Sequence, residues 1–168
     1  MIQRSSLGAY LLLALLVACR APEEVPVDRG ALAAEAASTL DDLHRAAAEA
    51  DEARYFGHFA PDGVFLGTDA SERWTVEAFR AYAHPHFQAG KGWTYRVAAR
   101  HLDVSSDGSH AWFDEALTNE KLGVCRGSGV LRRAQGAWQV VQYNLTIPIP
   151  NDLALEVAER IRRHAQGE

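Results

Sequence analysis

The sequence is poor in cysteine and has no excess of basic residues. Cys19 and Cys125 are the only cysteines among 168 residues, so a hydrophobic core rather than a disulfide network must hold the domain together. Lysine and arginine number 17 against 22 aspartates and glutamates, for a net charge of −5. This balance argues against nucleic acid as a partner, because phosphate binding needs clustered basic surface. No long apolar run follows the N-terminal segment, so we expect no later segment to span a membrane.

The N-terminal segment has a positive start and a short apolar run that ends at a cysteine. Arg4 precedes the apolar residues 7–18, a stretch too short to span a bilayer stably. Residues 16–19 (LVAC) resemble the lipobox of bacterial lipoprotein precursors. The resemblance implies cleavage before Cys19, lipidation of this residue and firm membrane attachment by several acyl chains. The alternative is an ordinary secretory signal with a chance cysteine. With Cys19 acylated, Cys125 has no disulfide partner, and a lone cysteine in a strand pattern is typical of a buried apolar side chain.

The chain therefore divides into a signal peptide (residues 1–18), a tether (residues 19–30) and a domain (residues 31–168). Two prolines and two glutamates between residues 20 and 29 give the tether little to pack. Arg20 stands where inner-membrane lipoproteins commonly carry an aspartate. The chain also has two lysines against fifteen arginines, which is typical of a GC-rich bacterial genome. We therefore expect a cell-envelope protein at the periplasmic face of the outer membrane.

Apolar spacing predicts helices first and strands afterwards. A stripe at spacings of three and four predicts a helix over residues 32–50, and a second helix begins after Thr75 as its N-cap. In the strand region the apolar face changes once, which a bulge near Ala98-Ala99 would explain and which would bend the sheet. The strands with period two are expected at residues 93–104, 110–121, 124–133 and 137–147.

The last segment predicts one more helix. We expect Asn151 to cap it and Leu153, Val157 and Ile161 to line its inner side. Helices followed by a meander of bent strands indicate an α+β fold with a strongly curved antiparallel sheet.

The chain contains several landmark segments: 55–62 (YFGHFAPD), 64–69 (VFLGTD), 72–74 (ERW), 126–131 (RGSGVL) and 138–143 (WQVVQY). Together they resemble the nuclear transport factor 2-like superfamily, and its SnoaL-like members in particular, over residues 33–147. The resemblance implies a cone-like sheet with the N-terminal helices over its concave face and a pocket between them. A lipocalin-type barrel is the alternative fold, but it does not explain two helical segments ahead of the sheet. The superfamily includes isomerases, dehydratases, hydrolases and binding modules, so the fold does not define an activity.

The last strand contributes three candidate ligand-binding residues. Trp138, Gln142 and Asn144 share one face of a regular strand. By the resemblance this face is the inner one, where the two amides would hydrogen-bond a carbonyl or hydroxyl group of a ligand. Alternatively, they satisfy backbone groups at the pocket mouth.

Charged and aromatic residues supply the other candidates. Asp69 lies near the position where the steroid-isomerase branch carries its proton-shuttling carboxylate, yet its surroundings also form an ordinary turn. Asp114 and Glu115 point to opposite faces of a strand, so only one can enter the pocket. If that residue is Glu115, Arg126 on the next strand can pair with it, either as a structural ion pair or as a ligand clamp. Trp74, beside the first loop, is the aromatic residue we expect to contact a ligand.

Three functions remain open. The first is a membrane-anchored domain that binds a small apolar or amphipathic ligand in its cone. The second is a general acid–base enzyme of the isomerase, dehydratase or cyclase kind, with Asp69 as base. The third is a partner-binding module that forms a homodimer through its sheet. His84 and His86 lack a third ligand at fixed spacing, so we expect no metal, and no motif indicates a cofactor.

Overall fold

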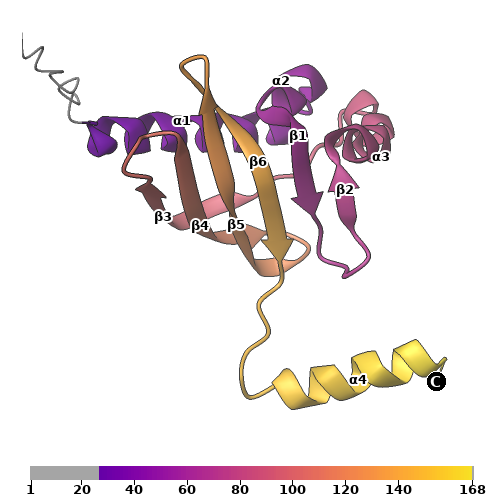
Figure 1. Cartoon of the computed structure of the whole chain (residues 1–168). Helices are drawn as coiled ribbons and strands as arrows, with labels where there is room; N and C mark the ends of the chain where they lie inside the picture. Colours follow the sequence, from indigo (N-terminus) through magenta and orange to yellow (C-terminus); the bar gives the residue numbers. More distant parts are fainter. Residues whose placement is uncertain (1–26, 168) are drawn as a thin grey trace, which may run out of the picture.

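The computed structural model describes residues 27–167 (Figure 1). The predicted signal peptide, Cys19 and most of the predicted tether lie outside the described residues. Among the helices that are described, none is long and apolar enough to cross a membrane.

Residues 27–167 form four helices and one six-stranded sheet. The helices are α1 (Arg29–Ala48), α2 (Glu52–Gly57), α3 (Val76–Gln88) and α4 (Ala154–Gln166). The strands are β1 (Phe59–Leu66), β2 (Arg73–Thr75), β3 (Arg96–Val104), β4 (His110–Asn119), β5 (Gly123–Ala134) and β6 (Ala137–Thr146). Their order in the sheet is β2-β1-β6-β5-β4-β3. The α+β class is confirmed, but β1 and β6 pair in parallel, so the sheet is mixed rather than antiparallel throughout.

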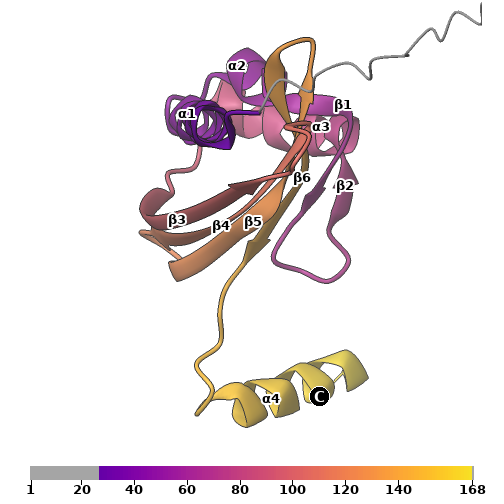
Figure 2. The same ribbon diagram turned by 60° about the vertical axis from the view of Figure 1, so that its left-hand side comes forward.

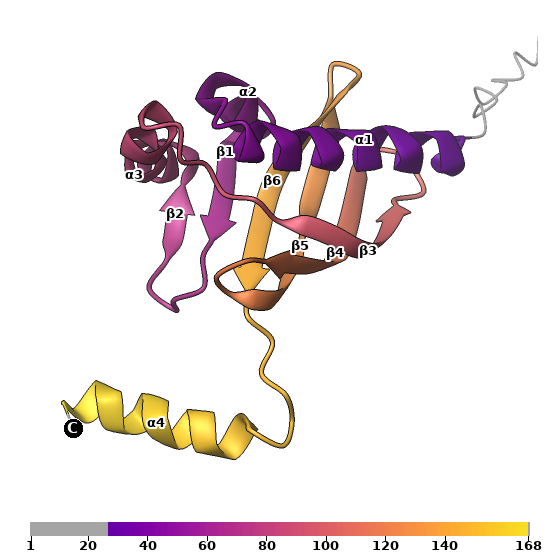
Figure 3. The same ribbon diagram turned by 180° about the vertical axis from the view of Figure 1, so that it is seen from behind.

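Helix α1 crosses the strands on the concave face of the sheet, and α2 and α3 lie at the end that holds β1 and β2 (Figures 2 and 3). Asp28 caps α1 by accepting a hydrogen bond from the backbone N–H of Ala31 at 3.0 Å. The predicted apolar stripe, with Leu40 and Leu43 at its centre, is buried. Each fully buried leucine contributes about 2 kcal/mol of transfer free energy, so this stripe fixes α1 to the sheet.

The sheet has an irregular pairing of β1 with β6 between Phe59 and Val64, and one bulge each in β3 and β6. In β3 the pairing with β4 shifts between Val97 and Ala99, which confirms the predicted bulge. In β6 the pairing with β5 shifts at Val141, because Val130 faces Gln142 while Leu131 faces Val140. The apolar face of residues 137–147 changes from Trp138 and Val140 to Tyr143 and Leu145, which marks this bulge, but the strand was predicted to be regular. The bulge reverses the alternation of every side chain that follows it.

An aromatic cluster fills the space between α2, α3 and the sheet. Tyr55 lies at its centre, with ring centroids of Phe56, Phe87 and Trp93 at 5.0, 5.6 and 5.6 Å. Aromatic pairs of this kind add about 1 kcal/mol each beyond the area they bury. The cluster therefore provides one rigid wall for whatever space the concave face leaves open.

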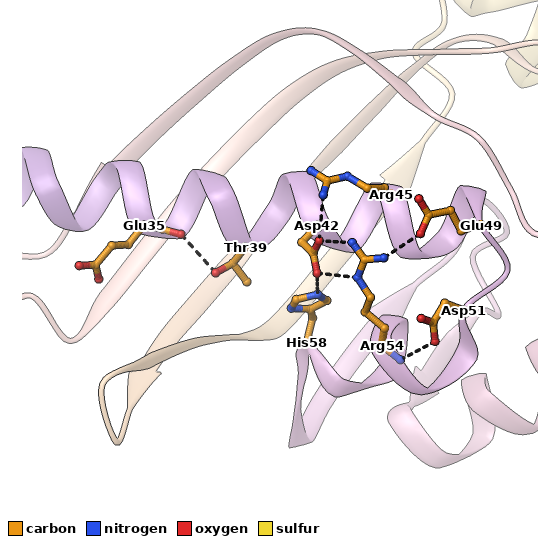
Figure 4. A network of polar contacts seen from close by, with 8 residues as sticks. All are labelled: Glu35, Thr39, Asp42, Arg45, Glu49, Asp51, Arg54 and His58. Atoms are coloured by element: carbon orange, nitrogen blue, oxygen red, sulfur yellow. Dashed lines mark hydrogen bonds and ion pairs between the residues drawn. The ribbon is translucent and has the colours of Figure 1, made fainter.

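Polar contacts fasten α1 to α2 at the outer corner of the domain (Figure 4). The Arg54 guanidinium forms a two-pronged contact with Asp42 and reaches Glu49 at 2.7 Å. His58 Nε2 contacts the same Asp42 carboxylate at 2.9 Å. Arg54, and after it His58, hold the pKa of Asp42 well below its usual range. These groups are partly exposed and fully paired, so we assign them a structural role.

Helix α4 lies away from the sheet in all three views of the ribbon. None of its residues is buried, and Leu153 and Ile161 are among the exposed apolar side chains. The expected inner side of this helix is therefore not packed. Leu153 rather than Asn151 is its N-cap, without a side-chain hydrogen bond. The helix holds its shape partly through pairs such as Glu156–Arg160, at 3.1 Å.

Candidate functional site

A pocket of about 200 Å³ opens between α1, α3, the β1–β2 hairpin and β6. Half of its sixteen lining residues are aromatic: Tyr55, Phe65, Trp74, Phe79, Tyr82, Trp93, Tyr95 and Tyr143. An apolar cavity of about 150 Å³ accommodates a benzene molecule, so this pocket fits a ligand of one or two rings.

A buried carboxylate lies directly behind two of the lining residues. The Glu115 side chain is fully buried, and its Oε2 is 2.8 Å from His44 Nε2 and 3.2 Å from Tyr143 Oη. Its Oε1 accepts a hydrogen bond from Arg100 Nε at 2.6 Å. His44 and Tyr143 both line the pocket, whereas Glu115 and Arg100 do not. Glu115 therefore positions two polar side chains at the pocket floor without facing the cavity itself.

The charges around Glu115 keep it ionised. Burial raises the pKa of Glu115, but the contacts with His44 and Arg100 outweigh burial, and the net pKa is lower than usual. Burial, and after it the negative charge of Glu115, raises the pKa of Tyr143 well above its usual value. The Tyr143 hydroxyl therefore donates to Glu115, and His44 Nε2 must carry a proton to do the same. In the His44 tautomer that carries its proton on Nε2, Nδ1 offers a lone pair to a ligand, and Tyr143 offers its oxygen, so in this form the floor presents acceptors.

Two features of the sheet allow Glu115 to contact His44, Tyr143 and Arg100 at once. A side chain at Gly127 of β5 would overlap the Tyr143 hydroxyl, and its Cβ would lie 3.0 Å from Glu115 Oε2. Arg100 follows the bulge in β3 and pairs with Glu115 across the strands. Its Nη1 also contacts Asp41 at 2.8 Å and the backbone oxygen of Ala37 at 3.1 Å, which ties the site to α1.

The bulge in β6 decides where three of the predicted ligand-binding residues lie. Trp138 precedes it and is buried on the inner side, but it does not line the pocket. Gln142 and Asn144 follow it and belong to the opposite face, so the expectation that they line the pocket is wrong. Tyr143 and Leu145 line it instead. The extra residue, Val141, is the physical reason.

Glu115 points inward and its neighbour Asp114 outward, as the alternation of β4 predicts. The expected partner of Glu115 is wrong, however. Arg126 faces Ala116 across the strands and is exposed on the outer face, whereas Gly127 faces Glu115. The buried carboxylate pairs with Arg100 and His44 instead.

Of the two candidate site residues near the β1–β2 hairpin, Trp74 lines the pocket and Asp69 does not. The Trp74 ring lies against Tyr82 with centroids 5.2 Å apart. Asp69 is exposed, and its Oδ1 accepts hydrogen bonds from Ser71 Oγ and the Ser71 backbone N–H at 2.5 and 2.8 Å. The side-chain bond to Ser71 is the main cause that lowers the pKa of Asp69. A base beside a carbonyl group needs a raised pKa, so Asp69 has the turn role.

Sequence reasoning missed the polar residues that do reach the pocket. His44 lies on the apolar stripe of the first helix, four residues after Leu40 and three before Ala47. A histidine on a buried helix face was the available signal. Tyr143 could be found only with knowledge of the bulge at Val141.

Comparison with known proteins identifies the fold as nuclear transport factor 2-like. One solved structure, an NTF2-like protein of unknown function from Pseudomonas putida KT2440, superposes with a TM-score of 0.61 at 16% identity, covering 73% of this chain and 91% of that one. A ketosteroid isomerase-like protein from Erwinia carotovora atroseptica superposes with a TM-score of 0.54 at 18% identity, covering 70% and 97%. No curated protein matches the chain. The SnoaL-like domain family matches residues 36–150, and the chain belongs to this family.

Proposed function

We propose that the chain is a lipid-anchored protein of the bacterial cell envelope whose pocket binds a small aromatic ligand that carries a hydrogen-bond donor. The proposal rests on the contacts of His44 and Tyr143 with Glu115 at the pocket floor. There the His44 tautomer with its proton on Nε2 and the Tyr143 hydroxyl both donate to Glu115, which leaves His44 Nδ1 and the Tyr143 oxygen as acceptors for a ligand. Aromatic walls around a few oriented polar groups are the usual composition of a small-molecule site. The ligand group that suits this floor is a hydroxyl or an N–H.

A matched pair of ligands tests this proposal. We expect the full chain carrying Cys19→Ser to bind 2-naphthol about tenfold more tightly than naphthalene, because one hydrogen bond to a polar group contributes about 1.4 kcal/mol. The double variant His44→Leu/Tyr143→Phe, which removes both acceptors, should abolish this preference while naphthalene still binds. His101→Leu, which changes a histidine that is 78% exposed outside the pocket, is the control. Equal affinity of the two ligands for the parent chain, or an unchanged preference in His44→Leu/Tyr143→Phe, contradicts the proposal.

A second candidate function is general acid–base catalysis, and the His44–Glu115 contact at 2.8 Å favours it. A carboxylate that orients an imidazole and stabilises its protonated form is a common arrangement for a general base. Exchange of the α-protons of 2-tetralone for deuterium, followed by NMR, tests this function without knowledge of the natural substrate. We expect the chain to accelerate exchange and His44→Leu to lose the acceleration. Exchange at the same rate with both chains rules out His44 as the base.

Membrane attachment rests on the resemblance of residues 16–19 to a lipobox, and its support is the order of short apolar run, small residues and Cys19. We expect Cys19→Ser to move the protein from the membrane fraction to the soluble fraction of its host. Flotation of the parent protein with outer-membrane markers tests the proposed location. Membrane retention of Cys19→Ser contradicts lipid anchoring.

A homodimer through the outer face of the sheet is a third possibility that one observation supports. Trp112 on β4 is 50% exposed on that face and lies in one row with Val130 and Gln142. Exposed tryptophans are enriched in protein interfaces. Sedimentation should then show a dimer that Trp112→Lys dissociates, and a monomer for the parent chain contradicts this possibility.

A further inference from the structure

The pocket has a mouth of different chemistry from its floor. Tyr82 is 51% exposed, Trp74 and Glu72 are half-buried, and all three line the cavity, whereas Tyr143 at the floor is buried. Glu72 immediately precedes β2 and Trp74 lies within it, and both side chains line the pocket. The mouth thus combines two aromatic faces with one carboxylate.

The position of Glu72 depends on a glycine opposite it. The Glu72 side chain lies across Gly67, where a Cβ would overlap the carboxylate. Its Oε2 also accepts a hydrogen bond from the backbone N–H of Asp69 at 3.2 Å, which holds the carboxylate over the hairpin. The sequence of the hairpin therefore fixes a negative charge at the rim of the pocket.

The charges of the lining are one-sided. Among the residues that line the described pocket there is no lysine and no arginine, and Glu72 is the carboxylate. The rings of Trp74 and Tyr82 are inclined by 39° with centroids 5.2 Å apart, so both can contact one ligand group. A cation within about 6 Å of an aromatic face is attracted to it, and groups of aromatic side chains recognise quaternary ammonium ions in this way. An anionic ligand group at the mouth would instead meet the Glu72 carboxylate and neither a lysine nor an arginine of the lining.

We infer that Glu72, Trp74 and Tyr82 form a cation subsite, and that the ligand is an aromatic molecule with an ammonium or quaternary ammonium group. The aromatic body lies in the pocket towards His44 and Tyr143, and the cationic group lies at the mouth. This inference rests on the proposed ligand-binding function of the pocket and adds the sign of the ligand charge to it.

The test compares two probes of the same shape by isothermal titration calorimetry at low salt. Benzyltrimethylammonium carries the charge, and 2,2-dimethylpropylbenzene is its neutral isostere. We expect the full chain with Cys19→Ser to bind the cation at least fivefold more tightly. Glu72→Gln should reduce this preference about threefold and Trp74→Leu should reduce it further. The control, Glu77→Gln, removes an exposed carboxylate of α3 outside the pocket and should leave the preference unchanged.

The outcomes separate the two proposals. Equal binding of both probes, tighter binding of the neutral probe, or a preference that survives both Glu72→Gln and Trp74→Leu overturns the cation subsite. In those cases the pocket still binds an aromatic probe, and the comparison of 2-naphthol with naphthalene decides the proposed function separately. If neither probe binds, the cation subsite falls, and failure of 2-naphthol to bind as well removes the proposed function too.

Discussion

Glu115 is the residue whose removal tests the account of the pocket floor most severely. Glu115→Ala removes the acceptor of contacts with His44, Tyr143 and Arg100. It also leaves the Arg100 guanidinium, whose side chain is only 12% exposed, without its buried partner.

The expected cost follows from the partners that remain. Breaking a buried ion pair by removing one side costs about 3–5 kcal/mol. Arg100 keeps its contact with Asp41, an exposed carboxylate, so we expect the lower end of this range, about 3 kcal/mol. For a domain of this size the melting temperature should fall by about 10 °C. Replacing the pair together, in Glu115→Leu/Arg100→Met, should recover most of the loss, because apolar side chains of similar volume substitute well for a buried pair.

Urea unfolding followed by circular dichroism measures this cost. The matched control is Asp114→Ala, since Asp114 is the adjacent carboxylate on the opposite face, 57% exposed and in contact only with His101. We expect its effect to stay within about 0.5 kcal/mol. If Glu115→Ala is no more destabilising than Asp114→Ala, or if the double variant is less stable than Glu115→Ala, the reasoning is refuted.

Four further predictions follow from the structure. Gly127→Ala should destabilise the fold by about 2 kcal/mol and weaken 2-naphthol binding, because the new Cβ would overlap the Tyr143 hydroxyl. The control, Gly57→Ala, should do neither, because a Cβ there meets nothing within 4 Å. Urea unfolding and titration with 2-naphthol measure both effects. Deletion of Val141 removes the unpaired residue of the β6 bulge but leaves Val140 opposite Leu131 and Gln142 opposite Val130, so the variant should still fold and bind 2-naphthol, which near-UV circular dichroism and titration report; an unfolded variant contradicts the observed register. Ending the chain after Pro150 should change the unfolding free energy by less than about 0.5 kcal/mol, because no residue of α4 is buried; a larger loss means that α4 packs in solution. The folded-state pKa of Glu115 lies below its ordinary value of 4.5, so its contribution to stability is complete above pH 4.5 and is lost as the pH falls through the folded-state pKa. The difference in unfolding free energy between the parent chain and Glu115→Gln should therefore become smaller below pH 4.5. A difference that becomes larger contradicts this prediction.

The fold was predictable because apolar spacing reports which side of a helix or strand is buried. The stripe around Leu40 and Leu43, the N-cap at Thr75 and the bulge near Ala98 all left a local pattern in the sequence. The parallel pairing of β1 with β6 left none, because it depends on how a short strand returns to the centre of the sheet. The predicted packing of α4 also failed, since an apolar face states that a helix can pack but not that it does.

The site was harder to predict because one extra residue in β6, Val141, exchanges the inward-facing and outward-facing side chains that follow it. Regular alternation through β6 placed Gln142 and Asn144 inside, whereas the bulge at Val141 exchanges them for Tyr143 and Leu145. The available signal was the change of apolar face from Trp138 and Val140 to Tyr143 and Leu145, which is the kind of change that located the bulge in β3. The partner of Glu115 was missed for a related reason, because cross-strand pairing was considered with β5, where Gly127 faces it, and not with β3.

The most direct test of the central claim is a crystal structure of the chain with 2-naphthol bound. The account predicts that the rings lie between Trp74 and Tyr143 and that the hydroxyl group donates a hydrogen bond to His44 Nδ1 or to Tyr143 Oη. A naphthol bound on the outer face of the sheet beside Gln142, or in the pocket with its hydroxyl group turned away from both acceptors, would contradict it.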